Sequence, residues 1–155
     1  MTPAEFLDQL LPAALTCQHT SGIPASFTLA QAALESSWGA RAPAFNLFGV
    51  KPGPAWKGPV VQVDTHEYVK GVRVPVKCAF RAYGSWLHCM KDHAQFFLQN
   101  PRYKPCFLEK TGEGWARAAA AAGYATDPAY ADKLIAIIRG RDLARFDSLP
   151  HEAKP

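Results

Sequence analysis

Glu35 is the side chain whose sequence context best suits acid–base chemistry. It stands in the segment QAALESSWG, on a predicted helix, close to the edge of an apolar stripe that includes Trp38. A carboxyl held against an indole ring is poorly hydrated, and poor hydration favours its protonated form. A carboxyl that keeps its proton near neutral pH can act as a general acid. We therefore predict that Glu35 is a proton donor, although most glutamates on helices are simply solvated.

A second carboxylate, Glu67, is predicted near the tip of a β-hairpin. Residues 60–69 and 72–80 alternate with the two-residue period of strands, and the Lys-Gly pair between them suits a two-residue turn. In this register Asp64 and His66 lie on the opposite strand face from Glu67. Glycosidases commonly use two carboxylates, so we predict that Glu67 faces the helix acid across a cleft. A solvated surface position is the alternative.

The separation of the two carboxylates would decide the mechanism. A separation of about 5 to 5.5 Å fits a retaining glycosidase, and one of roughly 6.5 to 9.5 Å fits an inverting glycosidase. In glycosidases whose substrate carries an N-acetyl group, attack by that group is a third route, which needs no second carboxylate from the protein. The sequence leaves all three mechanisms open.

The elements that must position these groups form a mainly helical α+β fold. Apolar residues recur at three- and four-residue steps along most of the chain, and the hairpin is the β structure that the pattern predicts. We expect one domain over residues 1–148, followed by a short tail at 149–155. An ordered loop packed on the core is predicted for residues 41–59. The predicted helices cover residues 3–17, a helix capped by Ser26 that stops at Gly39, residues 84–99, a stretch after Gly114 and a stretch opening at Asp127.

Composition narrows the class of protein. The 155 residues include 48% hydrophobic side chains, and the net charge of +4 is scattered without a long run of like charges, so nucleic-acid binding is not indicated. No apolar stretch is long enough to span a membrane, and the N-terminal segment carries Glu5 and Asp8 where a signal peptide would carry basic residues. We expect a monomer, made in the cytoplasm, whose four cysteines are free and mostly buried thiols.

Several motifs, in order along the chain, resemble the glucosaminidase family of glycoside hydrolases (family 73). They include QAALESSWG, NLFGVK, THEYVKG, FRAYGSW, NPRY and AGYATDPAYADKL, and together they run from about residue 21 to residue 138. The resemblance implies a lysozyme-like fold with the hairpin lobe beside a substrate cleft. It also implies cleavage of peptidoglycan glycan strands after N-acetylglucosamine, in the periplasm or cell wall, and it implies no cofactor and no metal.

The resemblance assigns roles to individual residues. Glu35 matches the catalytic acid of the family, and Glu67 matches its second acidic residue. Tyr124 matches a tyrosine of the active site, whose phenol could bind the N-acetyl group of the sugar. Four further residues are candidates for the sugar groove, with loop or core packing as the alternative for each; they are Asn46, Phe48, Trp38 and Tyr130.

Other functions compete with this prediction. A lytic transglycosylase or a muramidase would cut the same glycan, and the transglycosylase would need Glu35 alone. Cys89 and His93, four apart on a helix, could belong to a zinc amidase, although neither HExxH nor CxxC is present. A non-catalytic glycan-binding module is the last alternative. The wall would be reached by phage lysis, flagellar export or interbacterial delivery, and for a delivered effector we expect a cognate inhibitor protein that occupies the cleft.

Overall fold

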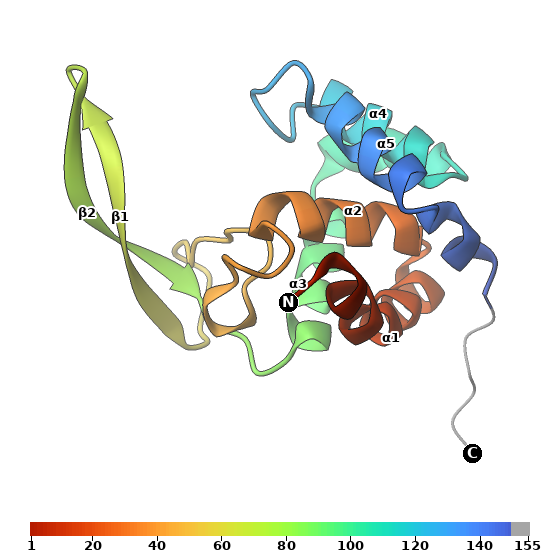
Figure 1. Cartoon of the computed structure of the whole chain (residues 1–155), viewed down its shortest axis with the longest axis horizontal. Helices are drawn as coiled ribbons and strands as arrows, with labels where there is room; N and C mark the ends of the chain where they lie inside the picture. Colours follow the sequence, from red (N-terminus) through yellow and green to blue (C-terminus); the bar gives the residue numbers. More distant parts are fainter. Residues whose placement is uncertain (150–155) are drawn as a thin grey trace.

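A computed structural model describes residues 1–149, which form a helical body with one long hairpin projecting from it (Figure 1). This arrangement confirms the predicted mainly helical α+β fold. The predicted tail at 149–155 falls outside the described residues except for Leu149, so its limits stay a prediction. The elements are α1 (Pro3–Ser21), α2 (Ala25–Ser36), β1 (Val60–Val69), β2 (Val72–Arg81), α3 (Trp86–Gln99), α4 (Gly112–Ala121) and α5 (Tyr130–Gly140), with 3-10 helices at Pro43–Phe45, Pro101–Leu108 and Leu143–Ser148.

The core of the body is built around α2. Nearly every residue of this helix is buried, so the helix is packed on most sides instead of along one amphipathic stripe. α1, α4, α5 and the last 3-10 helix all contact it. Phe27 of α2 lies edge-on to Phe97 of α3 and tilted against Trp115 of α4, with ring centroids 5.7 and 5.4 Å apart. A helix packed on most sides has little freedom to shift, and this fixes the position of residues at its end.

The start of α2 differs from the prediction. The helix begins at Ala25, and Ser26, which was predicted to cap it, lies inside the first turn. The carboxylate of Asp147 provides the capping contacts, because it accepts hydrogen bonds from the Ser26 backbone N–H at 2.7 Å and from the Ser26 hydroxyl at 2.6 Å. The cap therefore comes from the far end of the chain, where a local sequence signal cannot show it.

The hairpin has the predicted register. The ladder runs from the pair Val60 and Arg81 to a two-residue turn at Lys70 and Gly71, whose φ angles are 51° and 78°. Positive φ at both turn residues is the geometry that two-residue hairpin loops favour, and glycine adopts it without strain. One face of the hairpin is half-buried and the other is exposed. The half-buried positions include Val61, Val63, Thr65, Val74, Val76 and Cys78.

The helices after the hairpin follow the prediction with shifted starts. α3 spans nearly the predicted residues. α4 begins before Gly114, because the Thr111 hydroxyl accepts from the backbone N–H of Gly114 and caps the helix. α5 begins at Tyr130 and not at Asp127. The Asp127 carboxylate instead accepts from the backbone N–H of Ala129 at 2.9 Å and closes a turn just before the helix.

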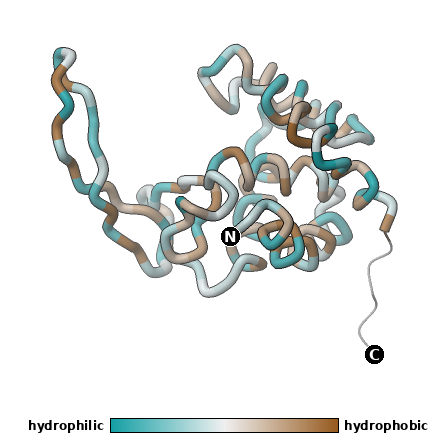
Figure 2. The backbone as a smooth tube through the Cα atoms, viewed as in Figure 1, coloured by the Kyte–Doolittle hydropathy of each residue, from teal (hydrophilic) through white to brown (hydrophobic). Residues whose placement is uncertain are grey.

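Apolar residues lie along the projecting hairpin as well as in the helical body (Figure 2). Near the hairpin turn, Val69 and Val72 are exposed. Within residues 1–149, no helix combines the length and the apolar character that a membrane crossing requires. All four cysteines are free thiols and three of them are buried, as predicted.

Candidate active site

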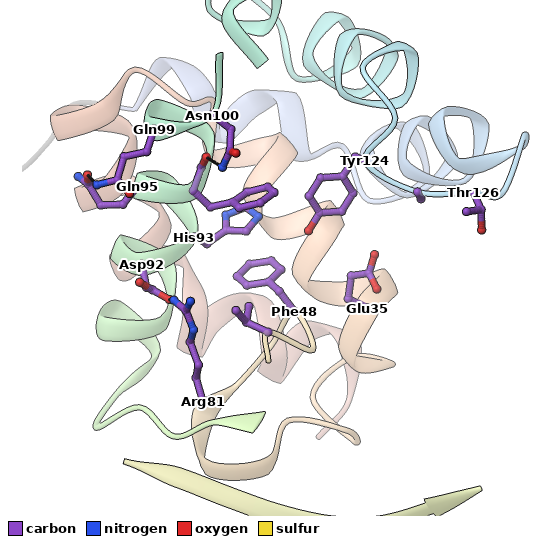
Figure 3. Close-up of a pocket in the computed structure, with 13 residues that line it drawn as sticks. Glu35, Phe48, Arg81, Asp92, His93, Gln95, Gln99, Asn100, Tyr124 and Thr126 are labelled. Atoms are coloured by element: carbon purple, nitrogen blue, oxygen red, sulfur yellow. Dashed lines mark hydrogen bonds and ion pairs between the residues drawn. The ribbon is translucent and has the colours of Figure 1, made fainter. Parts of the chain in front are cut away.

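Glu35 lies in the last turn of α2, where the buried helix reaches the surface. Its side chain is exposed and lines two neighbouring cavities of about 600 and 940 Å³. The smaller cavity is also lined by Phe48, Tyr124 and side chains of α3, and the larger cavity extends to the hairpin. Figure 3 shows the smaller cavity, with the Glu35 carboxylate on one side of it. A single carboxylate is therefore shared by both cavities.

One oxygen of the Glu35 carboxylate is held by a buried tyrosine. The hydroxyl of Tyr130 donates to Oε1 of Glu35 at 2.9 Å. Tyr130 in turn accepts from Nε2 of Gln31 at 3.0 Å, and Oε1 of Gln31 lies 2.7 Å from Nε2 of His93. Among residues 1–149, no side chain or backbone group hydrogen-bonds to the other carboxylate oxygen, Oε2. The carboxylate is thus fixed through one oxygen and free at the other.

The three residues behind Glu35 are almost completely buried. Gln31, Tyr130 and His93 are 0%, 4% and 3% exposed. Burial lowers the pKa of His93 from 6.5 to about 3, so its imidazole is neutral near neutral pH. Burial is also the main cause that raises the pKa of Tyr130 above its ordinary value, with smaller contributions from Tyr124 and Glu35. Both rings therefore keep their uncharged, hydrogen-bonding forms.

Tyr124 and Phe48 form walls of the smaller cavity beside Glu35. The ring of Tyr124 is stacked on Phe97 with centroids 5.6 Å apart, and the ring of Phe48 is stacked on His93 at 3.7 Å. Figure 3 shows the Tyr124 hydroxyl directed into the cavity. Burial, and then the nearby Glu35 charge, raises the pKa of Tyr124, so the phenol keeps its proton and remains a hydrogen-bond donor. The structure thus brings both predicted residues together with Glu35.

The larger cavity has one wall on the hairpin. Arg73 and His66 belong to this wall, and Nη2 of Arg73 lies 3.2 Å from Nδ1 of His66. Glu67 is exposed and is not among the side chains that line these two cavities. It pairs with Val74 and continues the half-buried face of the hairpin, which is the face that the alternation predicts. The structure does not bring Glu67 into contact with Glu35, and its catalytic role stays a prediction.

Comparison with known proteins assigns the chain to a family. Residues 11–143 match the family model described as glucosaminidase, mannosyl-glycoprotein endo-beta-N-acetylglucosaminidase. The chain belongs to the glucosaminidase family. It is 46% identical over 142 residues to peptidoglycan hydrolase FlgJ of Escherichia coli (strain K12), a match that covers 86% of this chain and 45% of that protein. It is 39% identical over 152 residues to exo-glucosaminidase LytG of Bacillus subtilis, covering 93% of this chain and 53% of that protein. The glucosaminidase chain therefore spans about half the length of these curated relatives.

Solved structures of related domains share the fold of this chain. The C-terminally truncated glycoside hydrolase domain of Salmonella typhimurium FlgJ is similar with a TM-score of 0.81 and 41% identity, over 90% of this chain and 97% of that chain. The catalytic domain of the autolysin Auto from Listeria monocytogenes is similar with a TM-score of 0.81 and 29% identity, over 94% of this chain and 87% of that chain. These matches confirm the predicted lysozyme-like fold with its hairpin lobe.

Trp38 does not shield the carboxyl of Glu35. α2 stops at Ser36, earlier than predicted, because the next two residues adopt positive φ angles of 51° and 55°. The chain therefore turns away, and the indole of Trp38 packs edge-on against Phe6 of α1 at 5.5 Å and under the guanidinium of Arg141 at 5.3 Å. Glu35 is exposed, so the predicted poor hydration is wrong. Trp38 lines neither of the two cavities, which gives its predicted contact with sugar no support.

Asn46 organises the loop that carries Phe48. It is 1% exposed, and all four of its hydrogen-bonding positions are occupied. Its Nδ2 donates to the carbonyls of Val50 and Arg81, and its Oδ1 accepts from the backbone N–H groups of Phe48 and Val50. Asn46 also lines the larger cavity, so its predicted place at the sugar groove stays a prediction, although its amide already has its full set of partners. Tyr130, predicted for the same groove, likewise uses its hydroxyl inside the protein.

The polar groups that support the site around Glu35 are not evident from the sequence. His93 and Gln31 are 62 positions apart, so no local motif indicates their contact. Arg81 donates to Asp92 at 2.8 Å from an adjoining element, and both residues line the smaller cavity. One local hint was available for Gln31, because it stands four residues before Glu35 and therefore shares its helix face.

The residues considered for a zinc amidase have other partners in this structure. Nε2 of His93 contacts Gln31, and Sγ of Cys89 accepts from the backbone N–H of Leu47 at 3.5 Å. In the part of the chain that the structure describes, no three His, Cys, Asp or Glu side chains lie close enough together to hold a metal ion. The zinc alternative therefore loses its structural basis, and the residues at the site suit acid–base chemistry by Glu35.

Proposed function

We propose that the chain hydrolyses the glycan strands of peptidoglycan, with Glu35 as the general acid. The observation that carries the proposal is that the Glu35 carboxyl is shared by two cavities, with one oxygen bonded to Tyr130 and the other free. The free oxygen is available to protonate the glycosidic oxygen of a strand that lies across both cavities. The 46% identity to a peptidoglycan hydrolase supports this polymer as the substrate.

The bond proposed is the one after N-acetylglucosamine, cut inside the strand. The name of the family model, an endo-β-N-acetylglucosaminidase, supports this bond. Because Glu35 lines two cavities, sugars of one strand can occupy one cavity before the cut and the other cavity after it, as internal cleavage requires. The similarity to an exo-glucosaminidase makes removal of terminal sugars the second candidate. The lengths of released fragments over time distinguish the two, because internal cleavage yields long intermediates first.

The walls of the smaller cavity suit a sugar bearing an N-acetyl group. Tyr124 offers a protonated phenol and Phe48 offers an apolar ring, both beside Glu35. A phenol donor can hydrogen-bond the N-acetyl oxygen, and the ring can cover the methyl group or a sugar face. Once the glycosidic bond weakens, positive charge develops on the sugar and needs a nucleophile or a base. We assign that part to Glu67, with the substrate N-acetyl group as the alternative.

Product end groups test the proposed bond. Purified peptidoglycan is digested, and the fragments are analysed by mass spectrometry. We expect free reducing N-acetylglucosamine ends from the native chain. Reducing N-acetylmuramic ends would indicate a muramidase, anhydro ends would indicate a lytic transglycosylase, and wall binding without any released fragment would indicate a glycan-binding module.

Two substitutions test the proposed residues in the same digestion. Glu35→Gln keeps the shape of the side chain but removes the proton donor, so we expect activity to fall by about three orders of magnitude or more. Asp8→Asn is the matched control, since Asp8 is an exposed acid on α1 that lines neither cavity. Near-native activity in Glu35→Gln would overturn the proposal.

Glu67→Gln separates the mechanisms. If Glu67 is the nucleophile or base, the substitution lowers kcat by about 100-fold or more. If the substrate N-acetyl group takes that part, Glu67→Gln keeps nearly native turnover, and a substrate without N-acetyl groups is not cut. The route to the wall and a cognate inhibitor that blocks the cleft stay predictions of the sequence.

A further inference from the structure

Tyr130, Gln31 and His93 form a chain of hydrogen bonds that begins at Glu35. The donor-to-acceptor direction of these hydrogen bonds bears on the reaction. We infer that His93, Gln31 and Tyr130 determine which oxygen of Glu35 carries the catalytic proton, by engaging Oε1 as an acceptor and leaving the proton on Oε2. The inference rests on the proposed role of Glu35 as the general acid. Each of the three residues contacts Glu35 or another member of this hydrogen-bonded chain. They affect the reaction only through Glu35, so they are positioning residues.

The direction of the chain follows from the groups that compose it. An ionised carboxylate can only accept, so Tyr130 must donate its single proton to Glu35 Oε1. The hydroxyl oxygen then accepts, and the group 3.0 Å away must be the amide NH₂ of Gln31. The amide oxygen of Gln31 therefore faces His93, whose Nε2 must carry a hydrogen. A neutral imidazole with its hydrogen on Nε2 meets this requirement, and burial keeps His93 neutral by lowering its pKa to about 3.

The same order persists when Glu35 takes up its proton. A proton on Oε1 would point at the Tyr130 hydroxyl, which would then face hydrogens from both Glu35 and Gln31. The Tyr130 proton would be left without an acceptor in a position that is 4% exposed, and a buried donor without a partner is costly. Turning the Gln31 amide around removes this conflict only if His93 also moves its hydrogen from Nε2 to Nδ1. A proton on Oε2 leaves every hydrogen bond of the chain intact.

The packing prevents the hydrogen-bonded chain of Tyr130, Gln31 and His93 from rearranging locally. Its members come from α2, α5 and α3, and Gln31 is completely buried. His93 is also held by its stack on Phe48, at 3.7 Å and nearly parallel. A change at any one position therefore requires movement in the core. The Oε1 contact is built into the body of the protein, and Oε2 is the oxygen available to a glycosidic bond.

Tyr130→Phe is the direct test. It removes the hydroxyl and keeps the ring stacked on Tyr124. Without the donor, the proton of Glu35 can occupy either oxygen and the side chain is less fixed, so we expect kcat to fall about 10- to 100-fold with KM changed less than about threefold. The limb of the kcat/KM pH profile that falls on the alkaline side should also move to higher pH, because the lost hydrogen bond favoured the ionised acid.

Ser26→Ala is the matched control for loss of a buried hydroxyl. Ser26 lies on the same helix at its other end, is 0% exposed and donates to Asp147 at 2.6 Å. We expect it to lower the melting temperature while the pH profile stays in place. If Ser26→Ala moves the alkaline limb as far as Tyr130→Phe does, the effect is one of general stability and the inference is wrong.

Two substitutions at His93 test the member of the hydrogen-bonded chain that is farthest from Glu35. His93→Gln places an amide donor near the position of Nε2, so we expect kcat and the pH profile to stay within about threefold of native values. His93→Phe keeps an aromatic ring against Phe48 but leaves Oε1 of Gln31 without a donor, so we expect the same alkaline shift as in Tyr130→Phe. Equal behaviour of the two variants would contradict a directed chain.

Glu35→Gln separates this inference from the proposed function. Loss of activity in Glu35→Gln, together with a lower kcat and a shifted limb in Tyr130→Phe, supports both. Loss of activity in Glu35→Gln with a native profile in Tyr130→Phe leaves Glu35 as the acid and overturns the positioning role alone. Retained activity in Glu35→Gln overturns both.

Discussion

His93 makes the stability of the helical body depend on pH. Its imidazole is 3% exposed, and burial lowers its pKa from 6.5 to about 3. Between these two values the unfolded chain binds a proton that the folded chain excludes. The free energy of unfolding therefore decreases as the pH falls through this window and is restored above it. A change from about pH 7 to about pH 5 should therefore lower the free energy of unfolding.

The size of the effect follows from the same two pKa values. At about pH 5 the medium is about 1.5 units below 6.5 and still well above 3, so His93 is charged in the unfolded chain only. Each unit contributes about 1.4 kcal/mol, which gives a loss of about 2 kcal/mol from this single group. For a chain of this length, such a loss lowers the melting temperature by roughly 4 to 8 °C.

The assay compares the native chain with His93→Gln, which cannot titrate. Urea unfolding is measured at several pH values between these limits, and the difference between the two proteins is taken at each. Other groups titrate in both proteins, including the half-buried carboxyl of Asp147, whose pKa is raised by burial, so their contributions cancel. We expect the native chain to lose about 2 kcal/mol more than the variant. An equal loss in both would show that His93 is hydrated or charged in the folded protein, which would contradict the prediction.

Three further changes test the groups that hold the site. Asn46→Ala removes four hydrogen bonds at a buried position, so we expect urea titration to show a loss of about 2 to 3 kcal/mol; an unchanged midpoint would contradict its assigned role. Arg81→Lys keeps a charge beside Asp92 but loses the planar contact over the Trp56 ring, so thermal melting should show a loss of about 1 kcal/mol, and full stability would mean that the ring contact is dispensable. Tyr124→Phe keeps the ring stack and removes the hydroxyl, so glycan hydrolysis should show kcat about tenfold lower at unchanged stability; native kcat would remove Tyr124 from the site.

The hairpin is predictable from the sequence because its determinants are adjacent. Alternation sets which residues share a face, and a Lys-Gly pair between the alternating runs accommodates positive φ at both turn positions. The pairing of Val60 with Arg81 follows once the turn is fixed. The position of Glu35 on a largely buried helix is predictable for a similar reason, because the residues that indicate it are adjacent in the sequence.

The supporting groups are not predictable in this way, because their partners are distant in the chain. The Asp147 carboxylate that caps α2 lies 121 positions from Ser26, and His93 lies 62 positions from Gln31. Periodicity marks Gln31 as a residue of the Glu35 face but cannot show what the amide contacts. Trp38 was misplaced because two positive φ angles after Ser36 redirect the chain, and neither residue there is a glycine or an asparagine that would signal them.

Glu35 and Glu67 differ in how many structural elements hold them in place. Glu35 belongs to the largely buried helix α2, and its Oε1 accepts from Tyr130 of α5. Tyr130 is linked through Gln31 to His93 of α3. Glu67 belongs to a sheet that, within residues 1–149, consists of the two strands β1 and β2. The hairpin is joined to the body at its base, where the carbonyl of Arg81 accepts from Asn46. We therefore expect the position of Glu35 to be set by the fold. The position of Glu67 relative to the bond that is cut, if Glu67 has the proposed role, is expected to be set only when a glycan strand binds.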